Sequence, residues 1–213
     1  MEWLASFTDL VLHLDKHLVF FVQQYGDWVY ALLFAIIFTE TGVVIAPFLP
    51  GDSLLFVAGA LCVTEGMSLP LLMLLLVVAA ILGDAVNYSV GRWFGVALMT
   101  RTRLISPEKI KYTQDFFEKH GPKTIVIARF LPIVRTMAPF VAGFSGMQAK
   151  RFLTYNVSGG VLWVVSLTLS GYLFGNIPFI KNNPTAVILV IIFLSILPGI
   201  IAVLKARASG GKN

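Results

Sequence analysis

The sequence is poor in charge and has a single cysteine. Only 13% of its 213 residues are charged, whereas a soluble domain carries about 25%, and 57% are hydrophobic, with a mean hydropathy of +0.84. This composition excludes a disordered chain and argues against a soluble enzyme. It is typical of a protein that crosses a membrane several times. Because Cys62 has no second cysteine to pair with, an intramolecular disulfide is also excluded.

Motifs of the common enzyme and nucleic-acid-binding classes are absent. The three histidines, His13, His17 and His120, lie outside the long apolar stretches, so no histidine metal cluster is expected. The chain has no G-x-S-x-G elbow, no Walker A loop and no H-E-x-x-H motif. It also has no basic stripe with interleaved aromatics. We therefore expect no enzymatic activity, no cofactor, no metal and no nucleic-acid partner. Since the first residues lack a basic region, no cleavable signal peptide is expected.

Three apolar runs are long enough to cross a bilayer, which takes about 20 helical residues. The first is charge-free over 66–83 and extends to about Gly91, and the other two are charge-free throughout. The three runs predict transmembrane helices at 69–91, 152–174 and 184–204. Residues 1–68 contain one base against seven acids, whereas the chain from Arg92 onward contains 15 bases against three acids. Basic connecting segments stay in the cytoplasm. The segment 92–123 and the C-terminal tail are therefore expected inside, and the side of the N-terminus is left open.

Two further apolar stretches, 28–63 and 124–146, are too broken to be simple spans. Their helix-breaking residues are Pro47, Pro50 and Gly51 in the first stretch and Pro132 and Pro139 in the second. Each stretch is predicted to be a re-entrant hairpin, which a membrane tolerates only where protein or water lines the break. An alternative is that residues 18–46 form one kinked span.

The two hairpins resemble each other. Each contains Phe-Leu-Pro, then a charged residue, then a Phe-Val-Ala-Gly motif that ends at Gly59 or at Gly143. Each is followed by a span that carries a Gly-x-x-x-Gly motif, beginning at Gly91 or at Gly171. The charge pattern orients the two units oppositely, which predicts the inverted repeats typical of secondary transporters. The alternative is that these prolines and glycines only permit close helix packing.

Together these patterns predict an all-α integral membrane protein built from two inverted repeats. In chain order we expect an amphipathic interfacial helix at 1–27, repeat 1 at 28–95, a cytoplasmic loop with a short helix from Pro107 to His120 at 96–123, repeat 2 at 124–175, a C-terminal transmembrane helix at 184–204 and a cytoplasmic tail at 205–213.

Four charged residues lie inside the hairpins: Glu40 and Asp52 in the first, Arg129 and Arg135 in the second. A charge at mid-membrane costs about 2.5–3.5 kcal/mol, so we expect carboxylate–guanidinium pairs between the hairpins. Arginine at a broken helix also suits a phosphate. In other interpretations Asp52 is only an N-cap and the arginines extend to the interface.

Asp84 and Asn87 lie one turn apart in the first predicted span. Polar side chains in a span face the protein interior, where they meet other polar groups. We expect them to be supporting polar contacts of the site.

The residues around these charges resemble the DedA family, also called the VTT or SNARE-associated domain family. The resemblance rests on the stretches 38–42, 47–56, 128–136 and 138–143 and extends over residues 10–205. It implies a bacterial inner-membrane protein with two opposed re-entrant hairpins that moves lipids across the bilayer. It also implies that the acids the family requires are Glu40 and Asp52, and that the arginines it requires are Arg129 and Arg135.

The favoured hypothesis is a flippase for a phosphate-bearing lipid, undecaprenyl phosphate, that supports envelope integrity. Arg129 and Arg135 would bind the phosphate, and Glu40 and Asp52 would pair with them in the empty state and couple transport to protons. The alternatives are a non-selective phospholipid scramblase and a structural or assembly factor that transports nothing. The expected partners are membrane lipids and protons, and homo-oligomerisation is left open.

Overall fold

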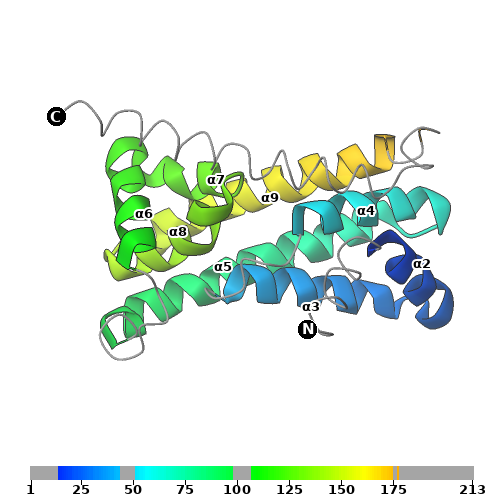
Figure 1. Cartoon of the computed structure of the whole chain (residues 1–213), viewed down its shortest axis with the longest axis horizontal. Coiled ribbons are helices and arrows are strands. Elements are labelled where there is room, and N and C mark those ends of the chain that lie inside the picture. The colour runs from blue at the N-terminus through cyan, green and yellow to red at the C-terminus, as the bar shows by residue number, and fades with distance from the viewer. Residues whose placement is uncertain (1–13, 44–50, 98–106, 175–176, 178–213) are drawn as a thin grey trace, which may run out of the picture.

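The computed structural model describes residues 14–43, 51–97, 107–174 and 177, and every regular element within them is helical. The elements are α2 (Leu14–Tyr25), α3 (Trp28–Gly42), α4 (Gly51–Thr64), α5 (Leu69–Ala97), α6 (Pro107–His120), the 3-10 helix η2 (Gly121–Lys123), α7 (Thr124–Ala128), α8 (Pro132–Phe144) and α9 (Ala149–Phe174). In Figure 1, α5 runs the length of the molecule, with α2 and α4 toward one end and α6, α7 and α8 at the other. The predicted all-α architecture is confirmed for these residues. The predicted helix at 184–204, the tail and residues 1–13 lie outside them.

Two helices, α5 and α9, are long and apolar enough to cross a membrane. They contain 29 and 26 residues, and a helix rises about 1.5 Å per residue, so both exceed the roughly 30 Å hydrocarbon core. The most apolar 18-residue window has a mean hydropathy of 2.5 in Leu69–Phe94 and 1.6 in Ala149–Phe174, and only 33% of each window is buried inside the molecule. Their exposed side chains include Leu74 and Leu162. Such an apolar outer surface is suited to lipid, and α5 and α9 are long apolar helices over the stretches where transmembrane helices were predicted, 69–91 and 152–174.

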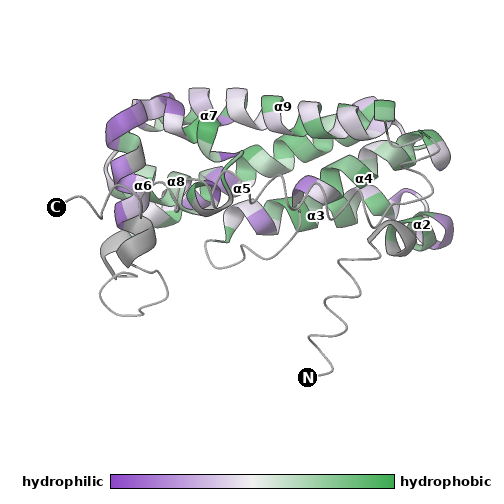
Figure 2. Ribbon diagram, turned by 45° about the horizontal axis from the view of Figure 1, so that its top comes forward, coloured by the Kyte–Doolittle hydropathy of each residue, from purple (hydrophilic) through white to green (hydrophobic). Residues whose placement is uncertain are grey.

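The short polar helix predicted in the connecting segment is α6. It begins at Pro107, whose fixed φ suits the first helical position, and it ends at His120. Gly121 follows with φ of 61°, a conformation that favours glycine. Figure 2 shows the hydrophilic colours gathered on α6 and the adjoining end of the bundle. This end therefore has the polarity expected of a segment outside the hydrocarbon region.

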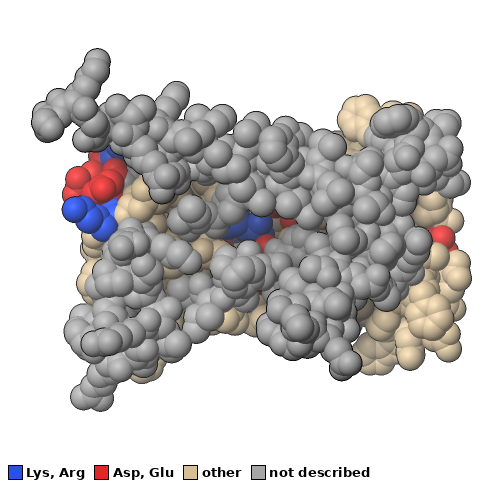
Figure 3. Space-filling model, viewed as in Figure 1, with Lys and Arg blue, Asp and Glu red and all other residues tan. Residues whose placement is uncertain are grey.

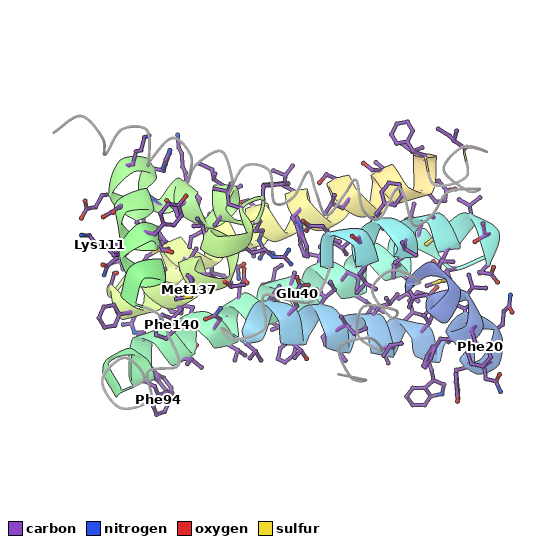
Figure 4. The ribbon with its side chains drawn as sticks, viewed as in Figure 1. Phe20, Glu40, Phe94, Lys111, Met137 and Phe140 are labelled. Atoms are coloured by element: carbon purple, nitrogen blue, oxygen red, sulfur yellow. The ribbon has the colours of Figure 1, made fainter. Side chains whose placement is uncertain are left out.

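Large aromatic side chains are exposed at both ends of the molecule. Figure 4 shows Phe20 at one end and Phe94 at the other, and Trp28 and Trp93, near them in the chain, are 72% and 77% exposed. Aromatic residues, tryptophan above all, are enriched where membrane meets water. The positions of these residues suit a bundle whose two ends lie at the two interfaces.

The break in the second hairpin falls between α7 and α8, at residues 129–131. Leu131 is extended, with φ of −125° and ψ of 103°, because the residue before a proline is driven out of the helical region. Pro132 then begins α8, where its missing N–H costs no hydrogen bond. In the first hairpin, α4 begins at Gly51, and Pro47 and Pro50 lie outside the described residues.

The prediction that Pro139 breaks the helix is wrong. Pro139 lies inside α8, which continues to Phe144. A proline within a helix removes one backbone hydrogen bond and usually bends the helix, but membrane helices accept it where neighbouring groups compensate. The carbonyl that loses its helical donor is that of residue i−4, which is Arg135. Pro139 therefore modifies the helix at a site residue instead of ending it.

Glycines bring the short helix α4 against the long helix α9, and the short helix α8 against the long helix α5. Each contact places a glycine against a backbone carbonyl of the facing helix: Gly59 against Thr168 and Gly171 against Phe56 for α4 and α9, and Gly143 against Tyr88 and Gly91 against Phe140 for α8 and α5. A Cβ atom at any of these positions would overlap that carbonyl. The motif that ends at Gly59 thus packs near the motif that begins at Gly171, and the motif that ends at Gly143 packs near the one that begins at Gly91. The two helix crossings share the same pattern of glycine contacts.

We expect Gly171→Ala to destabilise the protein by about 1–3 kcal/mol, the usual cost of overpacking. Its new methyl group would overlap the Phe56 carbonyl, which belongs to backbone and cannot swing away. Gly42→Ala is the matched control, since a Cβ there lies 3.5 Å from its nearest neighbour, Gly83. Thermal unfolding of the purified variants in detergent measures the difference. Equal midpoints for both variants would contradict the close-packing account.

Candidate functional site

Charged side chains from five helical segments meet in the middle of the bundle. Glu40 comes from α3, Asp52 from α4, Asp84 from α5 and Arg135 from α8, while Arg129 follows α7 at the break. Figure 4 shows Glu40 near the centre of the molecule, and Figure 3 shows basic and acidic atoms together near the middle of one face. The helix packing therefore brings together the charges that the sequence singled out.

Arg135 lies between the two acids of the first hairpin. Its Nη1 donates a hydrogen bond to Asp52 Oδ1 at 3.1 Å, and its Nη2 lies 3.1 Å from Glu40 Oε1. The second contact is an ion pair without hydrogen-bond geometry, and Nη2 and Glu40 Oε2 make no hydrogen bond with the described residues. The side chains of Arg135, Glu40 and Asp52 are 11%, 7% and 20% exposed. Most of this cluster is buried, but a small part of each side chain remains exposed.

The first turn of α4 gathers the two acids. Asp52 lies in that turn, and the Glu40 carboxylate lies against Gly51, where a Cβ atom would overlap it. Only glycine therefore lets the carboxylate approach. The positive end of the α4 dipole stabilises negative charge there. Asp52 is part of the helix, not its N-cap, and its carboxylate faces Arg135 and Trp163.

Arg129 has different partners from those predicted. Its Nη2 donates to Asp84 Oδ2 at 2.5 Å and to Asn156 Oδ1 at 2.6 Å, and the structure gives it no pair with Glu40 or Asp52 among the described residues. Asp84 belongs to α5 and Asn156 to α9, so Arg129 joins the two long helices. Because Arg129 is only 3% exposed, it does not extend to the interface. The expected pairing between hairpins holds for Arg135 and is wrong for Arg129.

Part of the Arg129 guanidinium has no hydrogen-bond partner. Nε and Nη1 are buried and make no hydrogen bond with the described residues. Gly159 and Gly160 of α9 leave the space that this side chain fills, since a Cβ at either would lie 3.3 or 3.5 Å from its atoms. A buried donor left unsatisfied costs about 1–3 kcal/mol, and more when charged. These donors therefore favour an anion or water beside them.

Asn87 connects the two hairpins through their backbones. Its Nδ2 donates to the carbonyl of Thr41, near the end of α3, at 3.3 Å and to that of Thr136, on α8, at 3.0 Å. Thr41 and Thr136 are each adjacent to a site residue, Glu40 and Arg135. Asn87 thus holds the backbone on both sides of this ion pair, in keeping with the supporting contact expected of it.

Two residues of the site, Asn156 and Trp163, were missed by the sequence reasoning. Trp163 is fully buried, and its Nε1 donates to Asp52 Oδ1 at 2.9 Å. Asn156, Gly159, Gly160 and Trp163 follow the i, i+3, i+4, i+7 spacing of one helix face. A polar side chain and two glycines on one face of an apolar span was the signal available in the sequence.

The comparisons with known proteins agree on one family. The family model for the VTT domain matches residues 49–173. Protein DedA of Escherichia coli strain K12 is 47% identical over 216 residues, which cover 100% of this chain and 99% of the relative. Inner membrane protein YqjA of the same strain is 44% identical over 158 residues, 71% of this chain and 70% of the relative. An uncharacterized membrane protein of Mycobacterium leprae is 40% identical over 189 residues, 86% of this chain and 85% of the relative.

No solved structure matches the chain. A family model that covers more than half of the sequence, together with a relative aligned along its whole length, establishes that the chain belongs to the DedA family of VTT-domain membrane proteins.

Proposed function

We propose that this protein is a lipid transporter that moves a phosphate-bearing lipid, undecaprenyl phosphate, across the bacterial inner membrane. One observation carries the proposal: Arg135 lies between Glu40 and Asp52 in the middle of the bundle, with guanidinium nitrogens that are not all hydrogen-bonded. A phosphate is the anion that best matches the paired donors of arginine. The identity of the lipid is what the resemblance to the DedA family implies.

Two inverted repeats, each with a re-entrant hairpin and one span, would form the transporter. The glycine contacts support this arrangement. The hairpin glycines Gly59 and Gly143 each follow a phenylalanine by three residues, and each unit packs on the long helix of the other. If the two repeats exchanged places, the crossing of α4 with α9 would coincide with the crossing of α8 with α5. Broken helices that meet at the midplane between inverted repeats are where transporters bind their substrates.

Transport would rest on an exchange of partners at Arg135. In the empty state the guanidinium pairs with the two carboxylates. Uptake of a proton by Glu40 or Asp52 removes one of the charges that hold Arg135, which then binds the lipid phosphate. Return of the proton on the other side restores the pair and releases the lipid. This cycle couples transport to the proton gradient and needs neither a cofactor nor an enzymatic step.

The orientation follows from the charge distribution. The basic connecting segment 92–123 and the C-terminal tail would lie in the cytoplasm, by the positive-inside rule. A relative named as an inner membrane protein of Escherichia coli supports the inner membrane as the location. A reporter fused to the C-terminus tests this side directly, and an extracytoplasmic signal would contradict it.

Lipid translocation in proteoliposomes tests the function. Undecaprenyl phosphate is compared with phosphatidylethanolamine, with and without an imposed pH gradient. We expect movement of undecaprenyl phosphate alone, faster with the gradient. Equal movement of both lipids without a gradient would replace the flippase with a scramblase. Movement of neither by folded protein would favour an assembly role, for which exchanging the charges in Glu40→Arg with Arg135→Glu would preserve function.

A further inference from the structure

Trp163 contacts both arginines of the site. The indole of Trp163 lies 4.1 Å from the Arg135 guanidinium carbon, measured to the ring centroid, and 5.7 Å from that of Arg129. Both distances are within the range of a cation–π contact. Trp163 is among the largest side chains of the core that are fully buried, so water does not weaken these contacts. One ring therefore contacts both ion-pair clusters, that of Arg135 and that of Arg129.

The edge of the same ring holds a carboxylate. Trp163 Nε1 and Arg135 Nη1 both donate to Asp52 Oδ1, at 2.9 and 3.1 Å. The tryptophan thus contacts Arg135 through its face and the acid partner of Arg135 through its N–H. A leucine or valine would fill a similar apolar position in α9 but would supply neither contact.

Resting on the transport function proposed above, we propose that Trp163 is a positioning residue that keeps Arg135 and Asp52 in place while Arg135 exchanges Asp52 for a lipid phosphate. When the phosphate takes the donors of Arg135, the ring face still holds the guanidinium. Asp52 still accepts the indole N–H, so the carboxylate does not lose every donor at once. The exchange then requires only a local rotation of the guanidinium, and both partners return to the same geometry when the lipid leaves.

Two substitutions distinguish the contribution of the Trp163 ring face from that of its N–H group. Trp163→Leu removes both, and we expect it to raise the half-saturating concentration of undecaprenyl phosphate in the translocation assay about 30-fold, the size expected of a desolvated cation–π contact. Trp163→Phe keeps an aromatic face, and we expect it to restore this concentration to within about 3-fold of the wild type. Val164→Ala is the matched control, because Val164 is equally buried in α9 and its apolar side chain can form neither a hydrogen bond nor a cation–π contact. It should lower the unfolding midpoint without changing the half-saturating concentration.

A fluorescence measurement keeps the proposal testable if Trp163→Leu does not fold. The chain has four tryptophans, and replacing Trp3, Trp28 and Trp93 by phenylalanine leaves Trp163 as the only tryptophan, whose emission is excited selectively at wavelengths that tyrosine does not absorb. We expect undecaprenyl phosphate to change its emission, because the guanidinium rotates above the ring and a phosphate charge is added beside it. The uncharged alcohol undecaprenol should not, and the change should disappear with Arg135→Gln.

Two results would overturn the role of Trp163. The first is a half-saturating concentration for Trp163→Phe as high as that for Trp163→Leu. The second is lipid binding, shown by a raised unfolding midpoint, that leaves the Trp163 emission unchanged. Failure of the transport function is a separate outcome, since it appears as absent translocation and absent binding in the wild type.

Discussion

Arg135→Gln is expected to lower the rate of undecaprenyl phosphate translocation about 100-fold or more. Arg135 is the residue through which both carboxylates of the first hairpin are held, at 3.1 Å each. A hydrogen bond to a charged group contributes about 1.5–3 kcal/mol, and each 1.4 kcal/mol is a factor of about ten. Losing the two donors that would face a phosphate therefore removes about 3 kcal/mol or more. Glutamine offers one amide group and no charge, so it replaces neither the ion pair nor the phosphate contact.

The controls separate this effect from unfolding. Arg151→Gln removes an exposed arginine of α9 and should leave the rate unchanged. Arg135→Lys keeps the positive charge but loses the two-pronged geometry, and we expect an intermediate rate. All three variants are compared by unfolding midpoint before reconstitution. A folded Arg135→Gln variant with the wild-type rate would rule out the exchange at Arg135.

Asp84→Ala is expected to destabilise the protein by about 3–5 kcal/mol. It would leave the Arg129 guanidinium, which is 3% exposed, with Asn156 as its only hydrogen-bond partner among the described side chains. Removing one member of a buried ion pair is costly because the remaining charge is uncompensated. Asp115→Ala is the matched control: Asp115 is exposed on α6, and surface changes usually stay within about 0.5 kcal/mol.

A double variant shows whether the cost comes from the pair. Replacing a buried pair by apolar residues of similar size is often neutral, so Asp84→Leu with Arg129→Met should recover most of the stability lost in Asp84→Ala. If Arg129 binds the lipid phosphate, the double variant should nevertheless transport poorly. Denaturant unfolding in detergent measures the first effect and the translocation assay the second. A double variant as unstable as Asp84→Ala would contradict the assignment of the pair.

Much of the fold was predictable because it depends on local composition. The two described spans follow from the length of their apolar runs, and α6 follows from a proline at its first position and a glycine after its last. The break at Pro132 follows from the restriction on the residue before a proline. Pro139 places the same restriction on the residue before it, yet α8 continues through it. The neighbouring residues in the sequence do not show whether other helices pack around a proline and compensate for its lost hydrogen bond.

The site was predictable only where opposite charges faced each other across the two hairpins. Glu40, Asp52 and Arg135 meet as the signs suggested. The partner of Arg129 depends on how α5 and α9 are rotated about their axes, which decides that Asp84 and Asn156 face inward. Hydropathy gives the length of a span but not that rotation. Trp163 was missed for the same reason, since its chemistry is apparent only from the two guanidinium groups against its ring.

Binding of a lipid phosphate at Arg135 is the central claim, and paired lipids test it most directly. The unfolding midpoint of the purified protein is measured with undecaprenyl phosphate and with undecaprenol, which differ only in the phosphate. We expect the phosphate lipid to raise the midpoint of the wild type, since a ligand that binds only the folded state stabilises it. We expect no rise with the alcohol and none with Arg135→Gln. Equal shifts by both lipids, or a shift that survives Arg135→Gln, would contradict a phosphate site at Arg135.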